Sequence, residues 1–411
     1  MNVAKYLSKN KKFINGILIT MLIGVVVNLL NYFFTVFLAR NVDDINFGFY
    51  NAALGIITLA QIPTIAIQTA LTKKVAKNKD INLTKFKNRS TLQLLAISLV
   101  ISLIFYLLGD YIADMANIPE IYILPLTLVV FGAILTPVLK GFLLGLEKIL
   151  AFNLILLVET VLKFVIGGIG IYYSTDMSLP ILAFVLPSIV IFILLYPFIG
   201  KKEDKEKPKT ISLDYKDISL TFITFFLLTI PFTLDLILVN PNVRASYGAL
   251  SLIGKIVFFA SVTIATVMIS KLANSKEKQK KKNLTLSLLV STATGIAISF
   301  LFLLFDKEIV GIVFDGKYQE IIPYIVPYSI AITGYAISYM VITSLLVNNS
   351  YVHIYFLLSI TVIQSFLFNL NNSSLYDAYI NQILIFSLLF ITSLFILIFY
   401  IFKSDGRKKS K

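Results

Sequence analysis

The sequence predicts an all-α integral membrane protein. We expect about 12 transmembrane helices in two pseudo-symmetric six-helix bundles around a central cavity. The composition, the spacing of apolar runs and a weak internal repeat support this fold class. Of the 411 residues, 57% are hydrophobic and only 14% are charged, and the mean hydropathy is +0.86. Soluble globular chains contain about 25% charged residues, so the composition excludes that class.

A transmembrane helix needs about 20 consecutive apolar residues. The chain contains twelve runs of about this length, and Gly145-Leu146-Glu147-Lys148 separates the fourth from the fifth. They lie at approximately 13–39, 47–71, 92–113, 121–144, 151–173, 179–199, 218–239, 246–270, 284–305, 322–346, 352–370 and 379–402.

The distribution of lysine and arginine predicts the orientation. With the N-terminus in the cytoplasm, 30 of the 36 basic residues fall in cytoplasmic segments, whereas outer loops carry acids such as Asp110 and Asp306. We therefore expect a multi-pass protein of the cell membrane with cytoplasmic N- and C-termini. The first apolar run exceeds the 7–15 residues or so of a signal-peptide core, so we expect it to be retained. The net charge of +14 follows from topology, and we expect no nucleic-acid partner.

A polar linker divides the chain into two halves. It covers residues 200–216, and six apolar runs precede it and six follow. We expect an N-terminal lobe at 1–199, a C-terminal lobe at 217–403 and a basic cytoplasmic tail at 404–411. Two short matches at an offset of 197 support a repeat: Tyr50-Asn51-Ala52-Ala53 with Tyr247-Gly248-Ala249-Leu250, and Lys74-Val75-Ala76 with Lys271-Leu272-Ala273. An even number of spans per half makes such repeats parallel.

Polar and small residues recur at helical spacing on the first two spans of each half. The stripes are Gly16, Thr20, Gly24, Asn28, Asn31 and Thr35; then Asn51, Gly55, Thr58, Gln61, Thr64, Gln68 and Thr72; then Asp217, Thr221, Thr224, Pro231 and Asp235; and finally Tyr247, Ser251, Lys255, Thr266 and Ser270. Such residues often join helices to one another in membranes. Because four stripes occur at matching places, we favour a shared cavity, with Asn28, Asn31 and Gln61 as substrate-binding candidates.

Ionisable residues inside spans are functional candidates because a charge at the bilayer centre costs roughly 2.5–3.5 kcal/mol. Asp235 lies in the seventh span and Lys255 in the eighth, and Asp235 is expected either to pair with Lys255 or to bind a coupling cation. Glu159 and Lys163 are one helical turn apart and can neutralise each other, so a structural pair and a substrate role both remain open.

Three basic residues lie nearer the ends of the predicted spans. Lys140 is a further candidate for substrate binding, although its side chain can reach the interface. Arg40, at an outer end, is also a candidate, and anchoring explains its position equally well. Arg244 has the same anchoring explanation.

The sequence offers no material for a metal centre or a disulfide. It contains no cysteine and one histidine, His353. We expect no cofactor, no metal, no catalytic residues and no enzymatic activity.

Three segments resemble polysaccharide flippases of the O-antigen type. They are Phe37-Leu38-Ala39-Arg40 followed by Asn46-Phe47-Gly48-Phe49-Tyr50; the run from Leu139 to Lys148, which is similar to the family's G-x-L-x-G-L-x-[KR] turn; and Thr233-Leu234-Asp235 with Tyr247-Gly248-Ala249-Leu250 and Lys255. Ser270 departs from the family pattern, which often has proline there. This family belongs to the multidrug/oligosaccharidyl-lipid/polysaccharide (MOP) exporter superfamily.

The resemblance implies a MATE-like pair of six-helix bundles that alternates between inward- and outward-open states. Its cargo would be a polyprenyl diphosphate carrying a short glycan, with Lys255, Lys163 and Lys140 available to the diphosphate and the polar stripes to the sugars. The implied partners are this lipid-linked oligosaccharide, membrane lipids and, through loose association, the polysaccharide assembly machinery.

The leading hypothesis is therefore a flippase that carries a lipid-linked oligosaccharide from the cytoplasmic to the outer leaflet for surface polysaccharide synthesis. A cation-coupled multidrug antiporter is the alternative within transport, but it would favour acidic residues over lysines in the cavity. A lipid II flippase usually has fourteen spans, and a membrane glycosyltransferase or polymerase would need a sizeable outer loop with catalytic acids. Both are less favoured.

Overall fold

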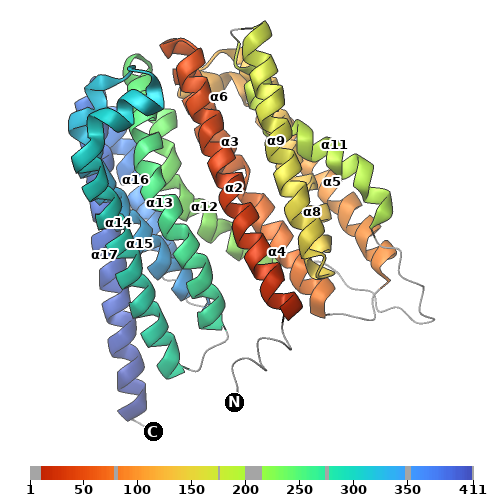
Figure 1. Ribbon diagram of the computed structural model, residues 1–411. Helices are drawn as coiled ribbons and strands as arrows, with labels where there is room; N and C mark the ends of the chain where they lie inside the picture. The colour runs from red at the N-terminus through yellow and green to blue at the C-terminus, as the bar shows by residue number, and fades with distance from the viewer. Residues whose placement is uncertain are drawn as a thin grey trace. The chain divides into compact units, whose positions relative to one another are not determined.

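The computed structural model is helical throughout the residues that it describes, which are 11–77, 82–174, 176–199, 215–273, 277–347 and 353–409 (Figure 1). Within these ranges, eleven helical segments are long and apolar enough to cross a membrane, and Leu186–Phe198 is a shorter apolar helix. The predicted class, an all-α multi-pass membrane protein with about 12 spans, is confirmed.

The chain divides into two compact units, Met1–Phe222 and Ile223–Lys411. Most of the predicted linker, 200–214, lies outside the described residues. The helices of the first unit are α2 (Lys11–Asn41), α3 (Asp44–Ala60), α4 (Ile62–Lys77), α5 (Leu83–Leu107), α6 (Gly109–Ala116), η1 (Glu120–Tyr122), α7 (Ile123–Leu135), α8 (Pro137–Gly145), α9 (Ile149–Tyr173), α10 (Ser178–Leu182), α11 (Leu186–Leu195) and η2 (Tyr196–Phe198).

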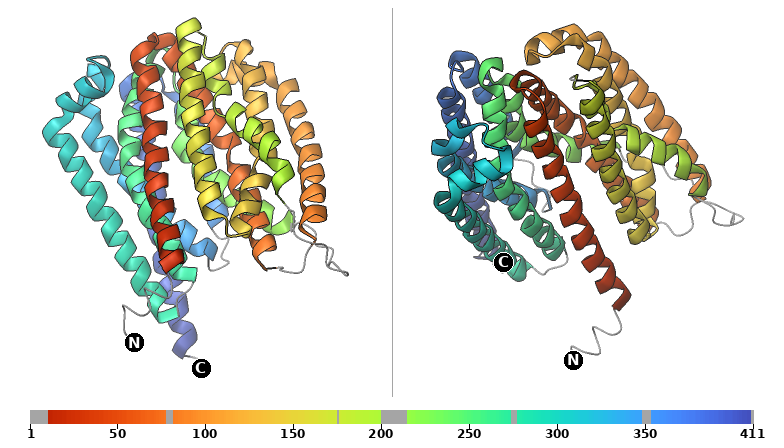
Figure 2. Two further views of the ribbon diagram at one scale, coloured as in Figure 1. Left: turned by 45° about the vertical axis from the view of Figure 1, so that its right-hand side comes forward. Right: turned by 45° about the horizontal axis from the view of Figure 1, so that its top comes forward.

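Helix α12 (Tyr215–Leu238) contains the boundary between the units, and the rest of the second unit follows it. The elements after α12 are η3 (Pro241–Val243), α13 (Arg244–Ala273), α14 (Glu277–Phe314), η4 (Gln319–Ile321), α15 (Ile322–Val347), α16 (His353–Leu370) and α17 (Leu375–Lys409). Figure 2 shows the long helices among them side by side.

Proline and capping residues set several helix boundaries. The second predicted span divides at Gln61 into α3 and α4, and Pro63 lies in the first turn of α4. The fourth divides before Pro137, which begins α8. Proline has no N–H to donate and is therefore tolerated in a first turn, where that donor has no helical partner. Asp43 caps α3 by accepting from the Asn46 N–H at 2.7 Å.

Two glycines bring α4 and α8 into close contact in the first unit. A Cβ added to Gly141 would lie 2.7 Å from the Leu71 Cβ, and one at Gly145 would lie 2.5 Å from the Val75 Cβ. Thr72 donates across the same contact to the Gly141 carbonyl at 3.2 Å. The glycines of the run 139–148 therefore have a packing role of the small-xxx-small kind.

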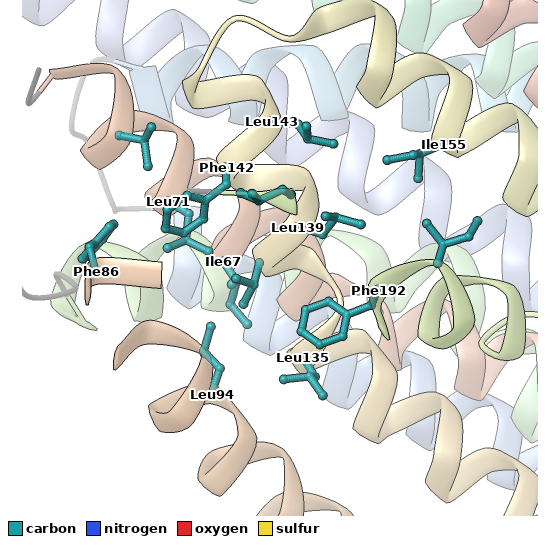
Figure 3. Close-up of a cluster of buried hydrophobic side chains, with 14 of the residues drawn as sticks. Ile67, Leu71, Phe86, Leu94, Leu135, Leu139, Phe142, Leu143, Ile155 and Phe192 are labelled. Carbon is teal, nitrogen blue, oxygen red and sulfur yellow. The ribbon is translucent and has the colours of Figure 1, made fainter. Parts of the chain in front are cut away.

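This contact lies in a hydrophobic core to which α4, α5, α7, α8, α9 and α11 of the first unit contribute (Figure 3). Ile67 and Leu71 of α4 meet aliphatic and aromatic side chains of α5, α7, α8, α9 and α11. The labelled members are Phe86, Leu94, Leu135, Leu139, Phe142, Leu143, Ile155 and Phe192.

The two units repeat one pattern of helix contacts. In the first unit, the second and third spans pack against the fourth, since α4 contacts α8 and α5 contacts α7. In the second unit, α13 and α14 both pack against α15 in the same way. Tyr50 and Tyr247, which the offset of 197 aligns, are both fully buried. Each bonds a polar side chain of the preceding span, Thr35 at 3.3 Å and Asp235 at 2.7 Å. These matching contacts support the internal repeat.

Lys87 is a structural residue, although the sequence places it in a basic loop. Helix α5 begins earlier than predicted, at Leu83, and Lys87 is buried. Its ammonium group donates at 2.8 Å to the carbonyls of both Tyr196 and Ile199, and it lies 3.9 Å from the centre of the Tyr196 ring. It thereby caps the end of α11 and η2, where carbonyl groups lack helical donors.

The α4–α8 contact gives a first prediction. Gly141→Ala should lower stability by about 1–3 kcal/mol because the new methyl group overpacks a tight helix contact. Thermal unfolding of the purified protein in detergent measures the effect. Gly311→Ala in α14 is the matched control, because a Cβ there meets nothing within 4 Å. Equal melting temperatures for the two variants would contradict the proposed packing role.

Candidate functional site

Lys163 of α9 is a buried cation in the first unit, with 6% of its surface exposed. Its ammonium group donates to the Asn31 side-chain oxygen on α2 and lies 4.2 Å and 4.8 Å from the ring centres of Phe184 and Phe34. Gly167, one turn further along α9, makes room for the Phe34 ring, since a Cβ there would lie 2.4 Å from it. An amide oxygen and two aromatic faces thus surround the charge.

The expected pair between Glu159 and Lys163 is wrong. Glu159 instead accepts from Lys140 of α8 at 2.7 Å, and both side chains are largely buried. Lys140 therefore does not reach for the membrane interface, because a carboxylate on the neighbouring helix neutralises it. Spacing along one helix permits a contact, but the packing of α8 against α9 decides which partner the carboxylate takes.

Lys163 has no ion pair within 4.0 Å in the part of the chain that the structure describes. The carboxylate nearest to Lys163 in the sequence, Glu159, is paired with Lys140. A buried cation without an anionic partner is costly, and the amide and the rings offset only part of that cost. The first unit therefore holds a charge that an incoming anion would stabilise.

Lys255 of α13 has comparable surroundings in the second unit. It is half-buried, and its ammonium group lies 4.6 Å from the centre of the Phe232 ring on α12. It forms no ion pair within 4.0 Å with Asp235, although the two charges interact through space. Of the two roles considered for Asp235, a direct ion pair with Lys255 is not formed, and binding of a coupling cation stays a prediction. Of the Asp235 carboxylate oxygens, Oδ2 accepts from the Tyr247 hydroxyl at 2.7 Å.

An aromatic cluster fixes the Phe232 ring beneath Lys255. Phe232 stacks on Tyr335 of α15 with ring centres 5.0 Å apart, and it lies 4.4 Å from the Phe258 ring of α13. The Tyr335 hydroxyl donates to the Leu228 carbonyl of α12 at 2.9 Å. The aromatic cluster at Lys255 thus comes from three helices, α12, α13 and α15. We call an ammonium group together with the aromatic rings against which it lies a lysine seat, so that Lys163 with Phe34 and Phe184 forms the first seat and Lys255 with Phe232 the second.

The predicted polar stripes serve different purposes. Asn28 and Gln61 are exposed on their unit, and Arg40 is exposed in the last turn of α2. Thr64 donates to the Ala133 carbonyl at 2.8 Å and, like Thr72, joins α4 to a neighbouring helix. Helix joining therefore explains part of each stripe. The side chains of Thr20, Asp217, Thr266 and Ser270 lie outside the part that the structure describes.

Arg244 has a structural position at the start of α13. It is buried and donates to the Val239 carbonyl at 2.9 Å and 3.2 Å and to the Ile237 carbonyl at 3.2 Å. These carbonyls lie at the C-terminal end of α12, which a cation stabilises. Anchoring at the interface is not needed to explain it.

Sequence reasoning missed two buried amides in the second unit, Gln364 of α16 and Gln382 of α17. Both donate to the Pro231 carbonyl of α12, at 3.3 Å and 2.6 Å. A polar residue in the middle of a span was the signal available for each. The polar stripes lie on the first two spans of each half, whereas Gln364 and Gln382 lie in the last two predicted spans of the second half.

Among the described residues, no group of three or more His, Cys, Asp or Glu side chains could hold a metal ion. What the arrangement offers is charge: one lysine ammonium group per unit, each inside a spanning helix and each seated on phenylalanine. Ammonium groups in such surroundings can bind phosphate oxygens through charge-assisted hydrogen bonds.

Solved structures of a flippase and of transporters are similar to this chain in fold. Lipid II flippase MurJ in an inward closed conformation matches with a TM-score of 0.75 at 15% identity, over 92% of this chain and 87% of that one. An inward-facing multidrug resistance MATE family transporter of the MOP superfamily matches with a TM-score of 0.72 at 13% identity, over 94% and 96%. An outward-facing structure of such a transporter gives 0.62 at 14%, over 96% and 95%. The TM-scores show a shared fold, and at these identities the similarity shows the fold alone.

No curated protein sequence matches the chain significantly. The model of a family described as "polysaccharide biosynthesis protein" does match, from residue 13 to residue 238. This range covers more than half of the chain. It includes Lys163 and the segments 37–40 and 46–50, which resemble the flippase family. The protein is therefore a multi-pass membrane protein with the fold of the MOP transporters, and it belongs to the polysaccharide biosynthesis protein family.

Proposed function

We propose that the protein is a flippase that moves a polyprenyl-diphosphate-linked oligosaccharide from the cytoplasmic to the outer leaflet by alternating access. The product would feed surface polysaccharide synthesis in the cell membrane, and no covalent chemistry is involved. Both chain termini lie in the cytoplasm in this proposal, as the distribution of basic residues favours.

One observation carries the proposal: each unit seats a lysine ammonium group on phenylalanine inside a spanning helix, without an ion pair in the described residues. The lysines are Lys163 and Lys255. A cation held in this way is stabilised by an anion that arrives with the cargo, and the diphosphate of a polyprenyl carrier is such an anion. Family membership supports a cargo used in polysaccharide synthesis.

The glycan and the coupling ion have candidate residues of their own. Asn28 and Gln61 expose amides that can bond sugar hydroxyls. Asp235 is fully buried and its Oδ1 atom has no hydrogen-bond partner within the described residues. We assign it the coupling of transport to a proton or a cation. The Glu159–Lys140 pair is given a structural role.

The positive charge of Lys163 and Lys255 bears on the two alternative functions, a multidrug antiporter and a lipid II flippase. A multidrug antiporter for cationic drugs would place its substrate beside two lysines, while the described acids Glu159 and Asp235 are already bonded to Lys140 and Tyr247. A lipid II flippase, which is the activity given for the MurJ structure, would also carry a lipid-linked cargo. Transport assays with different glycans separate that alternative from the function proposed.

The two seats give a second prediction. Lys163→Met and Lys255→Met should each lower transport of a polyprenyl diphosphate oligosaccharide by roughly 10–100-fold, because each removes a charge-assisted bond worth about 1.5–3 kcal/mol. Fluorescent cargo in proteoliposomes, with quenching from one side, measures the rate. Lys148→Met, at an exposed site between α8 and α9, is the control and should keep the wild-type rate.

If both variants transport as fast as wild type while inserting normally, the lysine seats are not the cargo site. If wild type moves no diphosphate-linked glycan but does move cationic drugs, an antiporter function replaces the proposal.

The third prediction concerns the Glu159–Lys140 pair. Lys140→Met alone should destabilise the protein by about 3–5 kcal/mol because it leaves the Glu159 carboxylate buried without its cation. The double variant Lys140→Met/Glu159→Gln should recover most of that stability and most of the transport rate. Thermal unfolding and the proteoliposome assay give the two readouts. Loss of transport in a stable double variant would instead assign the pair to the cargo site.

The fourth prediction concerns Asp235. Asp235→Asn keeps the size of the side chain and an acceptor for the Tyr247 hydroxyl, but it removes the charge. Transport in this variant should no longer respond to an imposed proton or sodium gradient. A variant that still responds to a gradient as wild type does would remove Asp235 from coupling.

A further inference from the structure

Helix α12 contains a proline within its span, and this proline creates an unusual demand for donors. Pro231 has no N–H, so the Leu227 carbonyl one turn earlier loses its helical hydrogen bond, and the proline ring crowds that turn. Hydrocarbon provides no water for polar groups, so side chains of neighbouring helices are the expected donors around such a break. The surroundings of Pro231 therefore show how the break in α12 is held.

Three buried side chains from three different helices donate to carbonyls beside this break, those of Leu228 and Pro231. The Tyr335 hydroxyl bonds the Leu228 carbonyl at 2.9 Å, and Gln382 and Gln364 bond the Pro231 carbonyl at 2.6 Å and 3.3 Å. Gln364 also donates to the Gln382 side-chain oxygen at 3.0 Å. The two amides are thus bonded to each other, and both donate to the same carbonyl.

Burying these amides is costly, and the cost is only partly recovered. Both glutamines are fully buried, and the Gln364 Oε1 atom has no hydrogen-bond partner within the described residues. An unpaired buried amide oxygen costs about 1–3 kcal/mol. Apolar side chains of the same volume would pack equally well. We therefore attribute the role of the amides to their hydrogen bonds with the Pro231 carbonyl.

The residues that follow Pro231 are those of the second lysine seat. Phe232, the next residue, has its ring 4.6 Å from the Lys255 ammonium group. Asp235, one turn beyond the proline, accepts from Tyr247 of α13. A shift or rotation of α12 at the break would move both side chains relative to Lys255.

We propose that Gln364 and Gln382 are positioning residues of the anion site: by holding the Pro231 carbonyl they fix Phe232 and Asp235 around Lys255. This inference rests on the proposed function, because it assumes that Lys255 binds an anionic headgroup. The two amides do not touch that anion. They act through α12, so their removal should matter only where Lys255 is present.

The test combines an anion probe with a position reporter. Geranylgeranyl diphosphate is the probe, titrated into the detergent-purified protein. The chain contains no cysteine, so Leu234→Cys in α12 supplies a single thiol whose alkylation by N-ethylmaleimide reports the local structure of the helix. Gln364→Met/Gln382→Met removes both amides at nearly constant volume. Gln382→Met alone keeps the Gln364 bond to Pro231 and guards against a folding defect.

We expect the double variant to bind the probe about tenfold more weakly and the introduced thiol to react about threefold faster, since the break is no longer held. In a Lys255→Met background the same double variant should cause no further loss of binding, because residues that act through one another are not additive. Asn381→Leu is the matched control. This buried amide of α17 bonds the Leu367 and Asn371 carbonyls and should leave alkylation and binding unchanged.

Additive losses in the Lys255→Met background would overturn the inference, as would an unchanged alkylation rate in the double variant. Failure of the proposed function has a different signature, in which the wild-type protein does not bind the diphosphate probe at all. In that case the link to an anion site fails, and the alkylation rates still decide whether the amides hold α12.

Discussion

The hydrocarbon around the spanning helices supplies neither water nor ions, so the buried polar groups of this protein depend on the protein itself for their partners. The basic side chains inside the bundles obey this constraint in three ways. Lys87 and Arg244 donate to carbonyls at helix ends, and Lys140 takes the Glu159 carboxylate. Lys163 and Lys255 rest on aromatic rings. Lys140 has a carboxylate partner, whereas Lys163 and Lys255 have none within 4.0 Å among the described residues, and one of these two lysines lies in each unit.

The two units satisfy the constraint with related contacts and different chemistry. Tyr50 and Tyr247 occupy equivalent positions, but the first bonds a neutral threonine and the second an aspartate. Lys163 is held by the Asn31 amide, whereas Lys255 has an acid in the surrounding helices that interacts with it through space. The first unit therefore offers a cation with neutral surroundings, and the second offers a cation whose field a nearby carboxylate reduces. In the function proposed, both lysines bind the cargo, and the second unit adds the acid that is assigned to ion coupling.

Helix α12 shows how strongly one backbone break can organise a bundle. Side chains of α13, α15, α16 and α17 all donate to its carbonyls. Pro231 interrupts the hydrogen bonding of α12, and the neighbouring carbonyls of Leu228 and Pro231 accept from side chains of adjacent helices. The donors at the break itself are uncharged amides and a tyrosine hydroxyl, which fix geometry without adding charge near Lys255.

The sequence by itself determined the membrane class, the succession of spans and the set of ionisable residues inside them, because apolar length and charge distribution are local properties of the chain. It also identified Lys163, Lys255 and Asp235 as the residues of interest. It did not determine partners: Glu159 joins Lys140 rather than Lys163, Lys87 is a buried cap, and Gln364 and Gln382 meet at Pro231. These choices depend on which faces of different helices pack together. Such contacts join residues up to 151 positions apart, and no spacing along one helix can encode them.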